Sequence, residues 1–141
     1  MEKTETLRVV LDTNVVLYAL SPRLHYQAIL QKGIQGDFEW WVTTEILLEY
    51  EEKVAEFFGL QVAHSFIETL LLSSHVKRSE IFFHFNLLDD PDDNKFVDCA
   101  VAANAHFLVS EDKVFLQMAE VSFPKINWVK SDQFLEILNV L

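Results

Sequence analysis

The stretch Leu7-Arg8-Val9-Val10-Leu11-Asp12-Thr13-Asn14 is a short apolar run that ends abruptly at a carboxylate. An unbroken run of aliphatic and β-branched residues is typical of a parallel strand that is buried on both faces. Thr13 and Asn14 are residue types that favour turns and helix caps, and the apolar residues after them predict a helix up to Leu20. The segment therefore predicts a buried strand that passes directly into a helix, with Asp12 at the junction.

Strand-like and helix-like patterns alternate along the rest of the chain. Ser21 and Pro22 predict the cap and the first residue of a second helix. Its end is expected at Gly33 or Gly36. Further strands are expected at 38–43, 106–110 and 125–129, and further helices at 44–58, 61–74, from 90 to about 103, at 111–119, and after the caps Ser131 or Asp132 to the end. Residues 81–85 are compatible with an edge strand or a buried connection. This order predicts an α/β fold with three layers, α/β/α, around a central, mostly parallel sheet of four or five strands.

Four acidic residues lie where strands or short loops pass into helices: Asp12, Glu49, Asp93 and Asp112. Ligands of a parallel sheet bind outside the carboxyl ends of its strands, and Asp12 and Asp112 follow closely on two predicted strands. Carboxylates that converge from distant parts of a chain repel one another unless protons or a hard cation neutralise them. The distribution therefore predicts a cation site, with Mg²⁺ or Mn²⁺ as the expected occupant.

Four segments, in this order, resemble the motifs of the PIN-domain family. They are Leu-Asp-Thr-Asn at 11–14, Glu-Ile-Leu-Leu-Glu-Tyr at 45–50, Asp-Pro-Asp-Asp-Asn-Lys-Phe-Val-Asp-Cys-Ala at 90–100 and Phe-Leu-Val-Ser-Glu-Asp-Lys at 107–113. Within that family the chain resembles the VapC type, a branch of toxin components from toxin–antitoxin systems. The resemblance spans about residues 8–128, and the ordered set is specific, whereas any single motif is weak.

The resemblance implies a metal-dependent endoribonuclease that hydrolyses RNA phosphodiester bonds, with a small antitoxin protein as its partner. Carried over by motif, the residues that hold Mg²⁺ or Mn²⁺ are Asp12, Glu49, Asp93 and Asp112, with Asp98 as a further candidate. Asn14 and Ser110 occupy positions at which the family often uses polar residues to orient a ligand or a water. A dication held by few carboxylates keeps bound waters and lowers the pKa of one of them, so no protein nucleophile is required.

Each of these acids also has a purely structural explanation. Asp12 is a suitable helix cap. Asp90, Asp92 and Asp93 would complement the dipole of the helix that begins there, and the motif selects Asp93 among them, with Asp92 facing solvent. Glu49 shares its helix with other acids and could belong to a solvated face, although it lies beside the apolar stripe. For Asp12, Glu49 and Asp93 the motif pattern favours the ligand role.

Two later acids, Asp98 and Asp112, can likewise be explained either as ligands or as purely structural residues. Asp98 shares a helix face with Asn94 and is rotated away from Asp93, so a surface acid explains it as well as a ligand does. Asp112 could be a first-turn acid beside the cap Ser110, and the motif favours its role as a ligand.

The composition indicates one globular domain, residues 1–141, in which half of the residues are hydrophobic. A formal net charge of −11 with 11 Lys and Arg argues against a broad basic face, so an RNA groove is narrow or is completed by a second chain. No apolar run approaches the roughly 20 residues of a membrane span, and the polar start shows no secretory signal. The single Cys99, expected in the core, favours a reducing cytoplasm. The 5 histidines show no paired spacing on one helix, which argues against zinc.

Two other functions compete with the nuclease. A catalytically silent PIN-like module that binds RNA or a protein partner would keep the fold with incomplete acids, whereas this chain has all of them. The other is a phosphatase or receiver-type acidic pocket on a similar sheet. A phosphatase of the haloacid-dehalogenase type needs Asp-x-Asp after the first strand, and here that position reads Asp12-Thr13-Asn14.

A homodimer is expected because so few basic residues must hold a polyanion. Basic residues of two subunits could surround one cleft: Lys77, Arg78, Lys95 and Lys113. Pairing with nearby acids explains Lys95 and Lys113 equally well. A core position or a dimer contact is favoured over base stacking for the clustered aromatics, which are Trp40, Trp41, Phe82, Phe83 and Phe85.

Overall fold

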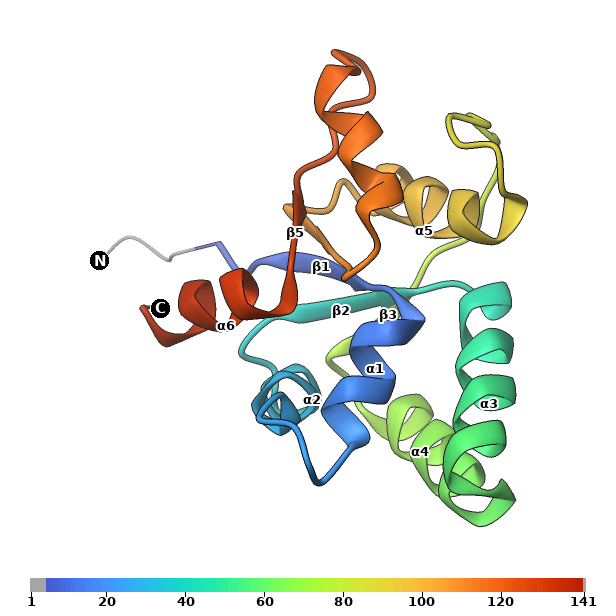
Figure 1. The fold of residues 1–141 in the computed structure, drawn as a ribbon, viewed down its shortest axis with the longest axis vertical. Coiled ribbons are helices and arrows are strands. Elements are labelled where there is room, and N and C mark those ends of the chain that lie inside the picture. Colours follow the sequence, from blue (N-terminus) through green and yellow to red (C-terminus); the bar gives the residue numbers. More distant parts are fainter. Residues whose placement is uncertain (1–4, 141) are drawn as a thin grey trace.

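The computed structural model describes residues 5–140 and shows a five-stranded sheet in which every strand pairing is parallel (Figure 1). The strands are β1 Arg8–Leu11, β2 Glu39–Val42, β3 Val76–Arg78, β4 Phe107–Val109 and β5 Trp128–Val129. Their order across the sheet is β3-β2-β1-β4-β5, so β1 lies at the centre. Leu11 is in register with Val109 on β4, and their carboxyl ends therefore open at the same rim.

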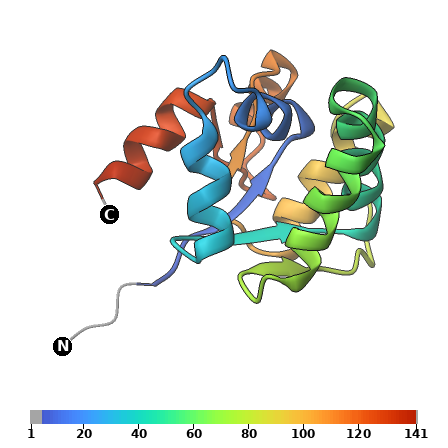
Figure 2. The same cartoon turned by 90° about the horizontal axis from the view of Figure 1, so that it is seen from below.

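Helices cover both faces of this sheet and confirm the predicted α/β/α layers. They are α1 Thr13–Leu20, α2 Gln27–Gln35, α3 Thr44–Phe58, α4 Leu60–Leu72, α5 Pro91–Ala102, the 3-10 helix η1 Lys113–Glu120 and α6 Ser131–Asn139. Figures 1 and 2 show α1, α3 and α4 on one face of the sheet and α5 on the other. No helix within residues 5–140 is long and apolar enough to cross a membrane.

A buried hydrogen-bonded chain of aromatic residues ties α3 to the central strand. Trp40 on β2 is fully buried, and its Nε1 donates to the hydroxyl of Tyr50 at 3.4 Å. The Tyr50 hydroxyl in turn donates to the carbonyl of Leu11, the last residue of β1. Phe66 of α4 packs against both rings, with centroids 6.2 and 6.3 Å away. These contacts fix the rotation of α3 about its axis, which decides where the preceding residue, Glu49, points.

The helix predicted to begin at Pro22 begins at Gln27 instead, so the expected cap role of Ser21 is wrong. Ser21 ends the preceding helix, because its backbone N–H donates to the carbonyls of Leu17 and Tyr18. The Gln27 side chain donates to the Ser21 carbonyl at 2.8 Å, which holds the intervening residues in a turn.

The helix after this turn ends at Gly36, one of the two glycines expected there, with a left-handed φ of 95°. Such a backbone conformation strains any residue with a Cβ, so glycine is the residue type that suits this position.

Residues 81–85 form neither an edge strand nor a buried connection; they are an irregular segment. Phe82 is 88% exposed and Phe83 is 65% exposed, so these two rings are not core residues. The strand β3, which the sequence pattern does not predict, lies just before this segment at Val76–Arg78. It contains a single apolar residue and so shows no strand pattern.

The C-terminal elements also differ in detail from the expectation. The helix expected at 111–119 is a 3-10 helix, and β5 is shorter than the strand expected at 125–129. The cap of α6 is Lys130 rather than Ser131 or Asp132, and the Glu111 side chain accepts from the Ser131 N–H at 3.0 Å. The polar residues 1–4 and Leu141, which the pattern assigns to the closing helix, lie outside the described residues.

Candidate active site

Asp12 lies at the carboxyl end of the central strand and is only 7% exposed. Its Oδ1 accepts from the Thr13 N–H at 2.7 Å, and its Oδ2 accepts from the Ser110 hydroxyl at 2.6 Å. Burial raises the pKa of Asp12 to about 6 even though both hydrogen bonds favour the ionised form, and the charges of Glu49 and Asp93 add to the rise. The central carboxylate of the rim is therefore held in position at an electrostatic cost.

Ser110 connects Asp12 to the last predicted acid. Its backbone N–H donates to the Val129 carbonyl at 3.0 Å, which fixes it at the end of β4. Its Oγ, while donating to Asp12, accepts from the Asp112 N–H at 2.9 Å. The Asp112 side chain accepts from the Val114 N–H at 3.0 Å and so caps η1. Asp112 is thus held near Asp12 through one shared hydroxyl, and the supporting role of Ser110 toward a ligand or water stays a prediction.

Glu49 faces the rim and not the solvated side of α3. One carboxylate oxygen accepts from the Thr13 hydroxyl, and the other lies 2.7 Å from the Lys95 ammonium of α5. Although burial of Lys95 works against its charged form, the hydrogen bond and charge of Glu49 raise its pKa. Sequence reasoning missed Thr13 as a site residue; the signal was its place beside Asp12, where a hydroxyl can reach a second acid.

The three acids at the start of α5 have different environments. Asp90 caps the helix by accepting from the Asp92 N–H at 2.9 Å, and the Asp92 side chain is 78% exposed beside Lys95, as expected for a solvent-facing residue. Burial, followed by the charges of Asp90 and Asp112, raises the pKa of Asp93. Asp93 is therefore the member of the trio that lies among the other acids of the rim.

A family model described as "PIN domain" matches residues 8–114. The chain belongs to the PIN-domain family. None of the curated proteins matches it.

Solved structures show the same fold. One is a chain of VapBC2 from Rickettsia felis, bound to a DNA fragment from its promoter, with a TM-score of 0.63 and 17% identity over 88% of this chain and 98% of that chain. Another is a chain of DNA-bound VapBC from Salmonella typhimurium, with a TM-score of 0.56 and 11% identity over 89% of this chain and 99% of that chain. At these identities the likeness establishes the architecture, and the expected PIN-like fold is confirmed.

Asp98, the further candidate ligand in this PIN domain, is buried on the side of α5 that faces the irregular segment. Its Oδ1 accepts from the Phe85 N–H at 3.1 Å, and its Oδ2 lies 3.0 Å from Nδ1 of His84. Asn94, one turn earlier, forms a pair of hydrogen bonds with the Leu88 backbone at 2.9 and 2.7 Å. Both side chains thus hold the segment that precedes α5.

Asn14, predicted as a supporting residue, is exposed on the first turn of α1, two residues after Asp12. Within residues 5–140, no hydrogen bond or ion pair engages its side chain. The structure therefore leaves its amide available at the rim, and its role stays a prediction.

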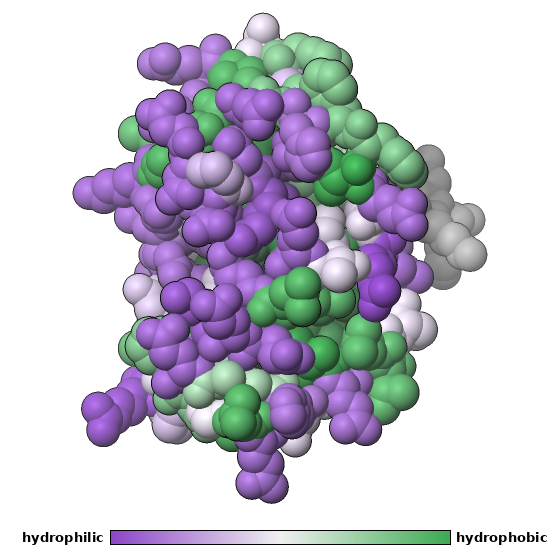
Figure 3. Space-filling view, turned by 90° about the vertical axis from the view of Figure 1, so that its right-hand side faces the viewer, coloured by the Kyte–Doolittle hydropathy of each residue, from purple (hydrophilic) through white to green (hydrophobic). Residues whose placement is uncertain are grey.

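The rim of this PIN domain offers a hard cation only oxygen donors of the kind that Mg²⁺ and Mn²⁺ prefer. Figure 3 views this side of the molecule and shows a band of hydrophilic residues across it. Within the described range 5–140, no three His, Cys, Asp or Glu side chains already meet the geometry of a metal site. The carboxylates are bonded to donors of the protein instead: Thr13, Ser110 and Lys95.

Proposed function

We propose that this PIN domain is a metal-dependent endoribonuclease. Its cation, Mg²⁺ or Mn²⁺, would be held by the rim acids, which are Asp12, Glu49, Asp93 and Asp112. The observation that carries the proposal is the environment of Asp12. Burial raises the pKa of its carboxyl to about 6, and the charges of two neighbouring acids make the ionised form still less favourable. The carboxylates of such a site repel one another, and burial strengthens that repulsion. A bound dication would neutralise them, so the site favours a dication.

The residues present suit phosphodiester hydrolysis. A bound dication would supply a water of lowered pKa and would offset charge on the phosphate. Ser110 and Thr13 hold the Asp12 carboxylate in one orientation, so little of it needs to reorganise when a ligand arrives. Lys95, already beside Glu49 at 2.7 Å, places a positive charge where a phosphate oxygen would approach.

The role of a toxin with a small antitoxin partner is proposed from the VapBC complexes that share this fold. We also propose a cytoplasmic location, with RNA as the substrate. A homodimer is proposed because the chain is acidic, with a net charge of −11, and the basic Arg78 and Lys113 are both exposed. Two copies would bring twice as many basic side chains to one substrate groove.

The decisive experiment compares cleavage of a mixed-sequence, single-stranded RNA with Mn²⁺, with Mg²⁺ and with chelator. We expect cleavage with either cation and none with chelator. Isothermal titration of Mn²⁺ into the protein supplies a readout that does not depend on turnover. Tight Mn²⁺ binding without cleavage of any RNA would identify the catalytically silent module instead, and cleavage that survives chelation would contradict the metal-dependent assignment.

A further inference from the structure

A cavity of about 570 Å³ opens beside the acidic rim, between the start of α3, the end of β3 with the irregular residues 79–86, and the start of α5. We call it the side cavity. Lys95 forms part of its wall, and the same ammonium lies 2.7 Å from Glu49. The side cavity and the proposed catalytic carboxylates are therefore separated by one side chain. Its volume is within the usual range of roughly 300–1,000 Å³ for small-ligand sites.

Buried polar contacts hold the wall of the side cavity in place. Asn94 binds both the N–H and the carbonyl of Leu88, at 2.9 and 2.7 Å. Asp98 accepts from the Phe85 N–H at 3.1 Å and lies 3.0 Å from His84. These contacts anchor residues 84–88 to α5, so the cavity is formed before a ligand enters and little ordering has to accompany binding.

The wall combines cations, neutral hydrogen-bonding groups and one free aromatic face. Arg78 and Lys95 supply positive charge, and Ser79 and Asn86 supply neutral donors and acceptors. Within residues 5–140, the side chains of Arg78, Ser79 and Asn86 make no hydrogen bond or ion pair. Phe82 lines the cavity and is 88% exposed, which is costly for an apolar ring that has no partner.

Three carboxylates in the same wall restrict the class of ligand. Glu45 and Glu80 line the side cavity together with Asp98, so a compact polyanion is disfavoured there. A nucleobase suits this mixture better, because carboxylates accept hydrogen bonds from its amino groups and an aromatic ring stacks on its face. The positively charged side chains of Arg78 and Lys95 would then bind the phosphate that is attached to the base.

We propose that the side cavity binds one unstacked nucleotide next to the scissile phosphate of single-stranded RNA, with Phe82 stacking on the base and Arg78 contacting the phosphate. The inference rests on the proposed nuclease function and adds a subsite to it. A base inside a duplex is paired and stacked on its neighbours, so it cannot enter such a cavity. The subsite therefore makes the protein selective for single strands.

The test uses the full chain and a fluorescein-labelled, mixed-sequence, single-stranded RNA. Fluorescence anisotropy in the Asp93→Asn background measures affinity without cleavage, and steady-state kinetics in the unmodified background separate KM from kcat. We expect Phe82→Ala and Arg78→Ala each to weaken binding by roughly five-fold or more, through KM, because loss of a stacking or phosphate contact is of that size. A duplex of the same sequence should bind more weakly than the single strand.

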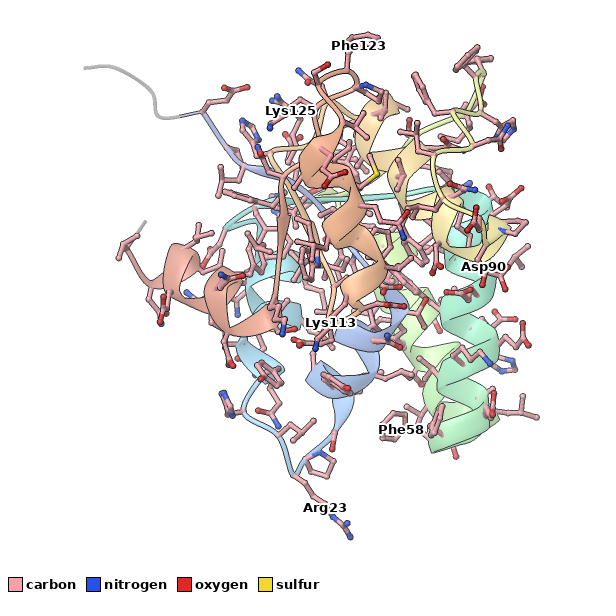
Figure 4. The ribbon with its side chains drawn as sticks, turned by 45° about the horizontal axis from the view of Figure 1, so that its top comes forward. Arg23, Phe58, Asp90, Lys113, Phe123 and Lys125 are labelled. Atoms are coloured by element: carbon pink, nitrogen blue, oxygen red, sulfur yellow. The ribbon has the colours of Figure 1, made fainter. Side chains whose placement is uncertain are left out.

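Phe123→Ala is the matched control, because Phe123 is 84% exposed and lies far from the start of α5, where Asp90 is labelled (Figure 4). It should change neither affinity nor KM. Normal RNA affinity of both Phe82→Ala and Arg78→Ala, in a protein that cleaves RNA, would overturn the subsite and leave the nuclease standing. A protein that neither binds nor cleaves RNA would overturn both.

Self-association provides a separate outcome of the same variants. If Phe82→Ala changes the sedimentation coefficient and leaves RNA affinity unchanged, a second copy of the chain occupies this surface and the subsite is wrong. A Phe82→Ala protein with unchanged sedimentation and weakened RNA binding supports the subsite.

Discussion

Ser110 donates a 2.6 Å hydrogen bond to Oδ2 of Asp12, although 98 positions separate the two residues in the chain. The parallel pairing of β1 with β4 makes this possible, because Leu11 and Val109, the residues just before them, are in register. The same hydroxyl accepts from the Asp112 N–H, so one side chain sets the positions of two acids. The geometry of the acidic rim depends on strand register as much as on the acids themselves.

Removal of the Ser110 hydroxyl should destabilise the protein and weaken cation binding. Ser110→Ala leaves a buried Asp12 oxygen without its donor, which costs roughly 1–3 kcal/mol. Ser131→Ala is the matched control, because the buried Ser131 hydroxyl has no partner among the described residues. Thermal unfolding and Mn²⁺ titration should both change in Ser110→Ala and stay constant in Ser131→Ala. Equal melting temperatures for the two variants would contradict the account of Ser110.

The metal-free protein should lose stability as the pH rises through about 6, because of Asp12. Its pKa is about 6 in the fold and 3.8 ordinarily, so the folded state binds the proton more tightly. The resulting stabilisation, about 3 kcal/mol, is fully present below pH 3.8 and is lost as the pH passes 6. Asp12→Asn should therefore melt higher than the unmodified protein at pH 7.5 in chelator. Identical pH profiles for the two proteins would refute the assignment.

The same variant should be inactive. The amide of Asp12→Asn retains the shape of the side chain without its charge, so the fold persists while the cation loses a ligand. Cleavage of single-stranded RNA should fall by at least roughly 100-fold, the upper end of what loss of an outer-shell partner costs. Full cleavage by this variant, with cation bound as before, would remove Asp12 from the site.

Removal of a carboxylate charge from α3 should lower RNA cleavage when the residue is Glu49 and leave it unchanged when the residue is Glu52. Glu49 contacts Thr13 and Lys95, whereas Glu52 on the same helix is exposed. Glu49→Gln should lower cleavage by at least roughly 100-fold, and Glu52→Gln should leave it unchanged. Circular dichroism checks that both variants fold. Comparable activity in the two would show that Glu49 is only part of a solvated face.

The Lys95 ammonium competes with the proposed cation for Glu49, so its removal should have opposite effects on two ligands. Lys95→Met should bind Mn²⁺ several-fold more tightly and single-stranded RNA more weakly, because a charge that neutralises Glu49 and attracts phosphate is gone. Lys53→Met is the control, since Lys53 pairs with Glu56 at 3.3 Å on an exposed part of α3. Calorimetry and anisotropy measure the two affinities. Parallel changes in both would contradict competition.

Sedimentation at micromolar concentration should report a dimer. The exposed ring of Phe83, close to the edge strand β3, supplies apolar contact area, and a two-fold pair is the commonest closed form. A strict monomer that cleaves RNA at normal rates would show that one subunit suffices.

Strong local signals made most of this fold predictable. The apolar run before Asp12, the stripe of α3 that ends at Gly59, and Asp90 with Pro91 at the start of α5 each have one physical reading, and the structure agrees. The prediction that Asp92 faces solvent is confirmed, with its side chain 78% exposed.

The remaining elements depend on contacts that sequence patterns do not carry. The strand at 76–78 has one apolar residue and forms because β2 offers it a free edge, and the turn at 22–26 is held by a side chain from Gln27. In the site, the four acids follow from motifs, whereas the hydroxyl of Thr13 reaches Glu49 only through the packing of α1 against α3.

The bond from the Tyr50 hydroxyl to the Leu11 carbonyl gives the protein two distinct ways to lose function. Glu49 and Asp12 each adjoin one end of this contact, so a change at Tyr50 disturbs the core and the acids together, and the expected product is a less stable protein. Under the proposed function, a change at a rim acid leaves a folded but inactive molecule that still presents its whole surface to a partner. Only this second kind of variant would still compete with active copies for that partner.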